Sequence, residues 1–191
     1  DRLDAGIILM QRVLLGALDK LPWMNRGDKK AKPASRPRIV EECRRNDIPP
    51  PPIKSNDPED YEEWEIEYAP RFPWVKALAD IRKANKALAT LQTMKLRLRE
   101  DGTIAFSLKY FGAHTGRWAG DGGINFQNFA REPIFVDAQW CIIDDPKELA
   151  GMFRENPDTV PVQSLDMRGL LLPPEGKLLG SVDAAQIEPR V

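Results

Sequence analysis

The chain is poor in the residues from which many functional sites are built. It has one histidine, His114, and two cysteines, Cys43 and Cys141, among its 191 residues. One imidazole and two distant thiols do not supply the usual Cys/His zinc set, so we exclude a zinc site. Two unpaired thiols are typical of a reducing compartment, and we expect a cytoplasmic protein.

Long apolar runs and an excess of charge are also missing. No run approaches the roughly 18 apolar residues that a spanning helix needs, so we expect no membrane association. The first ten residues show no secretory signal and no initiator methionine, so we expect a processed chain or one cut from a longer protein. Since 28 Lys and Arg face 29 Asp and Glu, any nucleic-acid binding requires a local basic patch. A content of 42% hydrophobic residues excludes a disordered chain.

Apolar residues at spacings of three and four predict two amphipathic helices, over residues 3–21 and 74–99. Between them, residues 33–73 hold nine of the seventeen prolines. Proline removes a backbone donor and disfavours helix in the residue before it, so this connector is predicted to be mostly extended or turned, with one short helix over 38–45. The acidic run 57–67 is interpreted as a solvated face.

The second predicted helix carries a local excess of positive charge. Its only acid is Asp80, and its bases are Lys76, Arg82, Lys83, Lys86, Lys95, Arg97 and Arg99. Two interpretations stay open: a solvated basic face, or a helix that follows a phosphate backbone. In the second case Lys83 and Lys86 are candidate DNA contacts.

The second half of the chain has the patterns of strands and turns. Asp101-Gly102 predicts a turn, and strict alternation over 103–111 predicts a strand with one apolar face. A further turn at 173–176 precedes a predicted buried strand over 177–182, which ends at Asp183.

These elements predict an α+β fold in two parts. Residues 1–100 form a helical region that includes the proline-rich and acidic connector 33–73, and residues 101–191 form a sheet-containing region.

A glycine-rich loop over 112–123 contains His114-Thr115-Gly116-Arg117-Trp118 and leads into a polar cluster formed by Asn125, Gln127, Asn128 and Arg131. No Gly-Lys-Ser/Thr follows the glycines, so the loop is not a phosphate-binding P-loop. Amide and guanidinium donors suit the minor groove, where every base pair presents an acceptor at purine N3 or pyrimidine O2. The alternative is an ordinary polar loop.

A second motif is Asp183-Ala184-Ala185-Gln186-Ile187-Glu188-Pro189-Arg190. A carboxylate at the end of an apolar strand is accessible to a metal ion and a triphosphate. Considered alone, an aspartate at this place is more often a cap or a turn residue.

In this order and spacing, the two motifs resemble the family A (DNA polymerase I-like) DNA polymerases, most closely those of bacteriophages. The stretch Thr-Gly-Arg…Asn-x-Gln-Asn is similar to the family's duplex-contacting palm motif, and Asp-x-x-Gln-Ile-Glu-x-Arg is similar to its motif A. Arg168-Gly169-Leu170 and a Pro-Glu-Gly turn lie between them, as in the family. The resemblance is specific over 103–191 and weak before residue 74.

The resemblance implies part of a template-directed DNA polymerase, with thumb helices and the first part of an antiparallel palm sheet. Asp183 would bind Mg²⁺ together with the backbone carbonyl of Ala184, and Glu188 would exclude a ribose 2′-hydroxyl. The duplex contacts would be Arg117, Asn125, Gln127, Asn128 and, as a phosphate contact, Arg131. The partners would be primer-template DNA and a dNTP, in the cytoplasm of a bacterium or a phage-infected host.

The chain departs from the family pattern at Ala184, Ala185 and Pro189, where the family has a larger residue, a serine and a leucine. The second catalytic aspartate and the triphosphate-binding lysine and tyrosine have no counterpart here. We therefore expect an inactive part, completed by a second polypeptide or by the remainder of a split or shortened polymerase. The alternative is a non-catalytic DNA-binding or accessory module derived from a polymerase. Glu188 argues against a single-subunit RNA polymerase.

Overall fold

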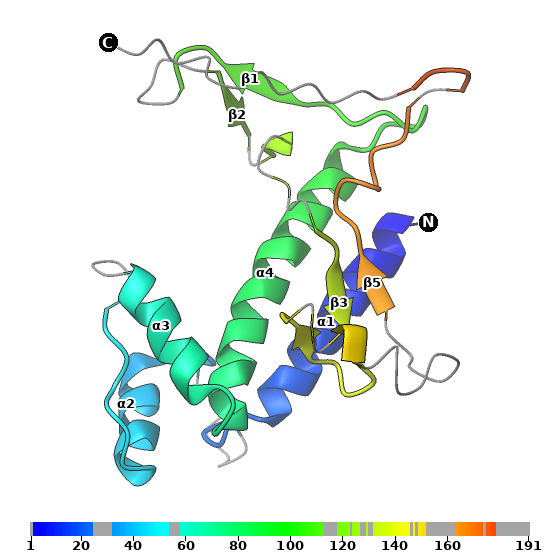
Figure 1. The fold of residues 1–191 in the computed structure, drawn as a ribbon. Helices are drawn as coiled ribbons and strands as arrows, with labels where there is room; N and C mark the ends of the chain where they lie inside the picture. Colours follow the sequence, from blue (N-terminus) through cyan, green and yellow to red (C-terminus); the bar gives the residue numbers. More distant parts are fainter. Residues whose placement is uncertain are drawn as a thin grey trace.

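The computed structural model is a mixed α+β structure, as the sequence predicts (Figure 1). It describes residues 2–24, 32–53, 58–112, 118–122, 124–126, 129, 132–145, 147, 149–151, 163–173 and 175–178. Both cysteines are free thiols. Within these residues, no helix combines the length and the apolar character needed to cross a membrane.

The longest elements of the described structure are four helices: α1 (Arg2–Asp19), α2 (Arg36–Arg45), α3 (Pro58–Tyr68) and α4 (Pro73–Arg97). The helices α1, α2 and α4 confirm the sequence predictions to within a few residues at each end. Helix α4 begins at a proline, which the first turn accepts because the N–H groups there have no partner within the helix.

Helix α3 corrects the prediction for the connector and for the acidic run. Residues 58–68 are helical rather than extended, and Trp64, Glu65 and Tyr68 are buried. Pro58 is the first residue of the helix, where proline is tolerated, so it does not oppose the helix. The run is therefore an amphipathic helix with a buried aromatic side, and only part of it is a solvated face.

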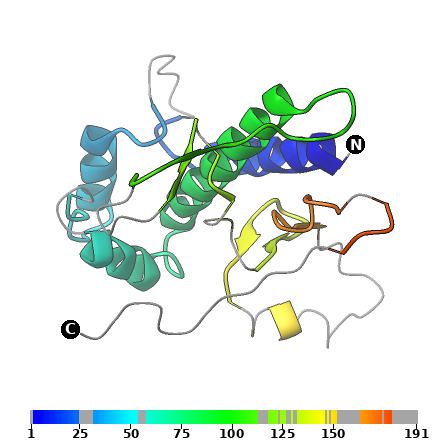
Figure 2. The same ribbon diagram turned by 90° about the horizontal axis from the view of Figure 1, so that it is seen from above.

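The helices α1 and α4 pack side by side and antiparallel (Figures 1 and 2). Leu3 at the start of α1 shares a core with Leu91 and Met94 near the end of α4, whereas Ala17 shares a second core with Leu78. Lys95 binds Asp4 at the same end of the pair as Leu3. This helix pair forms the frame on which the other elements pack.

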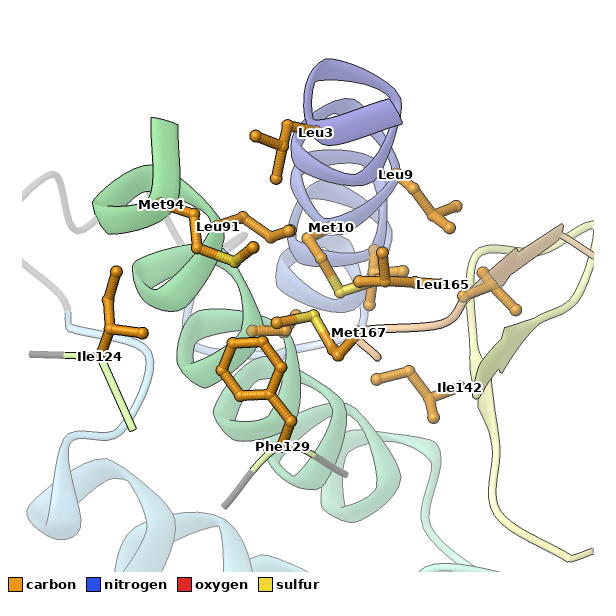
Figure 3. Close-up of a cluster of buried hydrophobic side chains, with 14 residues drawn as sticks. Leu3, Leu9, Met10, Leu91, Met94, Ile124, Phe129, Ile142, Leu165 and Met167 are labelled. Atoms are coloured by element: carbon orange, nitrogen blue, oxygen red, sulfur yellow. The ribbon is translucent and has the colours of Figure 1, made fainter. Parts of the chain in front are cut away.

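A three-stranded antiparallel sheet covers the pair, with strand order β4-β3-β5. Its strands are β3 (Ile134–Val136), β4 (Ile142–Ile143) and β5 (Gln163–Leu165), and Val136 pairs with both Ile142 and Gln163. The side chain of Val136 belongs to the core of α1 and α4, and those of Ile142 and Leu165 enter the same core (Figure 3).

This first core also contains Ile124 and Phe129, so it joins side chains from both sides of residue 100. The second core lies at the other end of the helix pair and is rich in aromatic rings. Trp23 and Trp64 pack against Trp74 with ring centroids 5.9 and 6.1 Å away. The indole N–H of Trp23 donates to the carbonyl of Pro33, and that of Trp64 donates to the carbonyl of Pro49. These two hydrogen bonds hold the proline-rich connector against this core.

Two short strands, β1 (Ser107–Lys109) and β2 (Ala119–Asp121), form a separate antiparallel hairpin beyond the C-terminal end of α4 (Figure 1). The strand predicted over 103–111 is thus only three residues long, and Ile104 makes an isolated bridge to Leu98. The predicted apolar face is present, but Phe106, Leu108 and Tyr110 are exposed. Alternation identifies a face without showing that a second layer covers it.

Of the turn predicted at 173–176, Glu175 and Gly176 are in a turn, with Gly176 at φ +74°, and residue 174 lies outside the described part. The buried strand predicted over 177–182 is wrong at its first two residues. Lys177 and Leu178 have no strand conformation, and Leu178 is 98% exposed. Neither residue pairs with a described strand, and without a partner strand an apolar run forms no sheet. Residues 179–182 lie outside the described part.

Candidate functional site

The structure describes three of the predicted site residues: Asn125, Lys83 and Lys86. Seven others lie outside the described residues, namely Arg117, Gln127, Asn128, Arg131, Asp183, Ala184 and Glu188. The site is therefore described through the elements that border the two motifs.

In the sequence, the Thr-Gly-Arg segment lies between strands β1 and β2, which form a hairpin. Leu108 pairs with Gly120, and beyond that pair Tyr110 lies against Trp118, with ring centroids 5.1 Å apart. Phe111 follows with φ +55°, a left-handed conformation that a bulky side chain rarely adopts. Residues before and after the loop are thus held together by backbone pairing and by one cross-strand aromatic pair.

Glycine at position 120 allows the predicted contact residue Asn125 to lie against the hairpin. A Cβ on Gly120 would lie 2.6 Å from the Cβ of Asn125 and 2.7 Å from the carbonyl oxygen of Ile124. Neither distance is tolerable for carbon, so any side chain at 120 would push this segment away. The glycine at 120 therefore lets the backbone of residues 124–125 approach the hairpin closely.

Two core residues border the polar cluster. Ile124 and Phe129 are buried, and the ring of Phe126 packs 5.2 Å from that of Phe129. The guanidinium of Arg168 donates to the carbonyl of Phe129 through Nε at 3.3 Å and through a terminal nitrogen at 3.2 Å. The Arg-Gly-Leu segment, more than thirty residues downstream, is therefore in direct contact with the backbone at Phe129.

Arg97, the last residue of α4, connects the basic helix to the hairpin. Its guanidinium donates to the carbonyl of Gly122 and occupies the space that a Cβ on Gly122 would need. Gly122 has φ +68°, which glycine adopts without strain. The end of α4, the hairpin and Asn125 thus form one continuous region.

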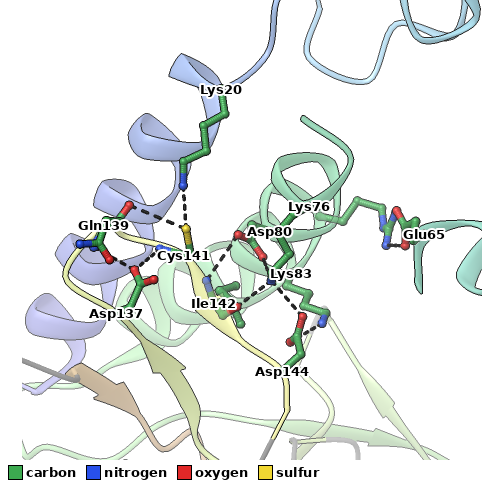
Figure 4. A network of polar contacts seen from close by, with 11 residues as sticks. Lys20, Glu65, Lys76, Asp80, Lys83, Asp137, Gln139, Cys141, Ile142 and Asp144 are labelled. Carbon is green, nitrogen blue, oxygen red and sulfur yellow. Dashed lines mark hydrogen bonds and ion pairs between the residues drawn. The ribbon is translucent and has the colours of Figure 1, made fainter. Parts of the chain in front are cut away.

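Much of the positive charge on α4 is paired within the chain (Figure 4). Lys83 binds Asp144 at 2.6 Å, and Arg82 binds the buried Glu65. Lys86 is exposed and has no ion-pair partner among the residues described. Of the two predicted phosphate contacts, Lys86 is thus available as it stands, whereas Lys83 would have to exchange a carboxylate for a phosphate.

A charge network around the buried Asp80 joins α4 to β4. The Nζ of Lys76 lies 2.6 Å from Asp80 Oδ1, 2.6 Å from the carbonyl of Ile142 and 3.0 Å from Asp144 Oδ2 (Figure 4). Asp80 also accepts the Ile142 N–H at 3.4 Å. The spacing of four residues between Lys76 and Asp80 is visible in the sequence, but the partners on β4 are more than sixty residues away and gave no signal.

Burial and the neighbouring charges compete in setting each pKa in this network. Burial raises the pKa of Asp80, and the ammonium of Lys76 offsets this only in part. Burial lowers the pKa of Lys76, but Asp80 and Asp144 outweigh burial and raise it. Burial also raises the pKa of Asp144, and the ammonium groups of Lys83 and Lys76 more than compensate, so that it lies below 3.8.

These charges border a cleft of about 900 Å³ between α3, α4 and the chain after β4. Its walls mix charged side chains such as Glu62 and Asp145 with the apolar Ile66 and Ala79. Within the described ranges, no group of three His, Cys, Asp or Glu side chains could hold a metal ion.

Comparison with known proteins gives no match: no family model, no curated protein and no solved structure corresponds to the chain.

Proposed function

We propose that this chain is the thumb and early-palm part of a template-directed DNA polymerase of the family A type. It would hold primer-template DNA for nucleotidyl transfer from a dNTP to a primer 3′-hydroxyl. The observation that carries the proposal is the ordered pair of motifs, 114–128 and 183–190, in one sequence. A further segment or polypeptide would supply the fingers and the second catalytic aspartate.

The described geometry supports the grip on DNA. Gly120 allows Asn125 to lie against the hairpin that borders Arg117. Arg168 donates to the carbonyl of Phe129, and Arg97 at the end of the basic helix donates to the carbonyl of Gly122, so both elements lie beside the segment that carries Asn125. Asn125 and the other proposed donors would reach minor-groove acceptors, which every correctly paired duplex presents whatever its sequence. Lys86, exposed on α4, would contact a phosphate.

The donor set near the second motif fits Mg²⁺. The carboxylate of Asp183 and the carbonyl of Ala184 are hard oxygen ligands, which Mg²⁺ prefers. Asp183 and the Ala184 carbonyl would hold Mg²⁺, which would supply positive charge against the charge that develops on a transferring phosphoryl group. Glu188 would occupy the space that a ribose 2′-hydroxyl requires.

The test is primer extension by the protein that contains this chain, either as the continuous polymerase or with its associated polypeptide. Asp183→Asn should abolish Mg²⁺-dependent synthesis while duplex binding is retained, because only a metal ligand is lost. Asp60→Asn, which changes an exposed acid on α3, is the matched control and should leave synthesis unchanged.

Three outcomes would count against the proposal. Synthesis that survives Asp183→Asn contradicts the metal role and favours a non-catalytic DNA-binding module. Unchanged ribonucleotide discrimination in Glu188→Ala contradicts the role of that side chain. Primer extension by a lone 21.6 kDa species in intact-mass analysis contradicts the need for a completing segment.

A further inference from the structure

A thiol and an amine are in contact where α1 meets the sheet. Lys20, the residue after α1, donates from Nζ to the Sγ of Cys141 at 2.6 Å (Figure 4). Cys141 directly precedes β4, and 121 positions separate the two residues in the sequence. Both side chains are half-buried, so a small molecule from solvent can reach them. Neither the proposed DNA contacts nor the charge network around Asp80 uses this pair.

The backbone at Cys141 is fixed by hydrogen bonds within a tight turn. The carboxylate of Asp137 accepts the N–H of Gln139 at 2.9 Å and that of Cys141 at 2.8 Å. The N–H of Asp137 donates to the carbonyl of Cys141 at 3.0 Å. Because these bonds join the two ends of the connection between β3 and β4, the paired strands set the position of the Cys141 side chain.

The same turn is held against α1. Trp140, directly before Cys141, has φ +61°, and a Cβ on Gly16 would lie 3.1 Å from the Trp140 Cβ. Glycine at position 16 therefore lets the turn approach the helix closely. The guanidinium of Arg12 lies 5.0 Å from the centroid of the Trp140 ring, within cation–π range. These contacts keep the sulfur of Cys141 beside Lys20.

This arrangement favours a reaction between the two side chains. The ammonium of Lys20 supplies positive charge to a thiolate, the form of cysteine that peroxides oxidise. Oxidation gives a sulfenic acid, whose sulfur condenses with a nearby nitrogen to form a sulfenamide. Reacting atoms in near-attack geometries are about 3–3.5 Å apart, and Sγ and Nζ of this pair are already closer. The other thiol, Cys43, is 0% exposed in the second core and is shielded from solvent.

We propose that Lys20 and Cys141 form an oxidative cross-linking site, at which hydrogen peroxide joins Sγ to Nζ through a sulfenamide bond. The thiolate attacks one peroxide oxygen, the O–O bond breaks, and the hydroxide that leaves takes a proton from the Lys20 ammonium. The resulting amine attacks the sulfur of the sulfenic acid, the S–N bond forms, and the sulfur-bound hydroxyl leaves as water with a proton from the nitrogen. One peroxide is thus reduced to two waters, the sulfur loses two electrons, and the chain loses two hydrogen atoms.

The cross-link would fasten the end of α1 to the start of β4. Its formation depends only on these two side chains and an oxidant, so this proposal does not rest on the proposed polymerase function.

The test treats the folded full chain with hydrogen peroxide and maps its tryptic peptides by mass spectrometry. The peptides that contain Lys20 and Cys141 should be recovered as one linked species, whose mass is the sum of the two minus two hydrogen atoms. Dithiothreitol should separate them, because a sulfenamide is reversible whereas a sulfinic acid is not. In the urea-unfolded chain the yield should fall about tenfold or more, because nothing holds the two atoms together.

Two lysine variants separate the amine from its charge. Lys20→Arg keeps a positive charge beside the sulfur but removes the reactive amine. Cys141 in this variant should still form a sulfenic acid, which dimedone traps, but no linked species. Lys147→Arg changes an exposed lysine that is nearer to Cys141 in the sequence, and it should cross-link like the wild type. Circular dichroism of each variant shows whether the fold is kept.

Recovery of Cys141 from the folded wild-type chain as a sulfinic or sulfonic acid, with Lys20 unmodified, would overturn the proposal. A disulfide between Cys141 and Cys43 would also overturn it, as would a linked species that forms equally in the folded and the unfolded chain. The wild-type chain alone decides these outcomes, so a variant that fails to fold does not leave the proposal open. Primer extension is a separate measurement, and its failure would leave the cross-link unaffected.

Discussion

Substitution of Asp80 tests how much the charge network between α4 and β4 contributes to the free energy of unfolding. The Asp80 side chain is 2% exposed and accepts from Lys76 Nζ and from the N–H of Ile142. Substitution by alanine leaves an ammonium and a backbone N–H short of an acceptor between α4 and β4. Such groups are costly because water cannot replace the lost partner.

The size of the stability loss depends on the hydrogen-bond and ion-pair partners that remain after the substitution. Breaking a buried ion pair on one side typically costs about 3–5 kcal/mol. Lys76 is 30% exposed and still reaches Asp144 and the carbonyl of Ile142, so we expect Asp80→Ala to cost about 3 kcal/mol of unfolding free energy, near the lower end. Asp144 is 45% exposed, and Asp144→Ala should cost less than about 1 kcal/mol.

The double variant Lys76→Met/Asp80→Leu replaces the ion pair by apolar side chains, so it measures the net contribution of the pair to stability. Because burial outweighs attraction in the pKa of Asp80, the pair gives little net stabilisation relative to apolar side chains of similar volume. The double variant should therefore recover at least about half of the loss caused by Asp80→Ala. Ile142 still lacks its acceptor, which limits the recovery.

Urea unfolding followed by tryptophan fluorescence measures these differences, since Trp23, Trp64 and Trp74 lie in the second core and report its exposure. The dependence of free energy on urea should keep the same slope in all variants, so that midpoints can be compared. A loss below about 1 kcal/mol for Asp80→Ala, the level of an exposed pair, would refute this reasoning. So would a double variant that is less stable than the single one.

Three further predictions test other contacts. Gly120→Ala should lower the unfolding free energy by about 1–3 kcal/mol in thermal melts, because its Cβ would overlap Asn125. Gly151→Ala is the control, since a Cβ there would meet no atom within 4 Å. Equal melting temperatures for the two variants would contradict the close approach of Asn125 to Gly120. Burial raises the pKa of the Cys43 thiol, whereas Cys141 is half-buried beside Lys20. A thiol reagent should therefore label Cys141 in the native chain and Cys43 only in urea. Rapid labelling of Cys43 in the native chain would contradict its burial in the second core. Although burial raises the pKa of Asp144, its lysine partners hold it below 3.8, so its contribution to stability is present at neutral pH and is lost as the pH falls through 3.8 and below. Asp144→Asn should therefore lose less stability than the wild type in urea titrations across this acid range, and parallel curves would contradict the lysine contacts.

Local periodicity accounts for what the sequence predicts well. The stripe of Leu78, Ile81 and Leu91 on α4 is buried, whereas Asn85, which interrupts it, is exposed. Leu98 lies inside the range 74–99 predicted as helix, but it follows the helix end and is exposed. Helix packing follows a repeat of 3.6 residues, which a single sequence displays directly.

Features that depend on distant partners were not predictable in the same way. The acidic run forms α3 because Trp64 and Tyr68 pack on residues from other helices. The pairing of Lys83 with Asp144 crosses sixty-one positions and reduces the free charge of the basic helix. The strand at 107–109 shows an apolar face, but alternation does not reveal whether that face meets the core, solvent or a ligand.

The most direct test of the proposed function asks whether the chain binds paired DNA through the minor groove. The affinity of the chain is measured for primer-template duplexes of different base sequence, and for one duplex in which 3-deazapurines replace the purines and remove the N3 acceptors. We expect similar affinities for the natural sequences and a loss of about tenfold or more for the deaza duplex, the scale of one good pair of base contacts. Asn125→Ala should reduce the difference between the natural and deaza duplexes. Equal binding of both duplexes, or strong preference for one base sequence, would contradict a polymerase grip on DNA.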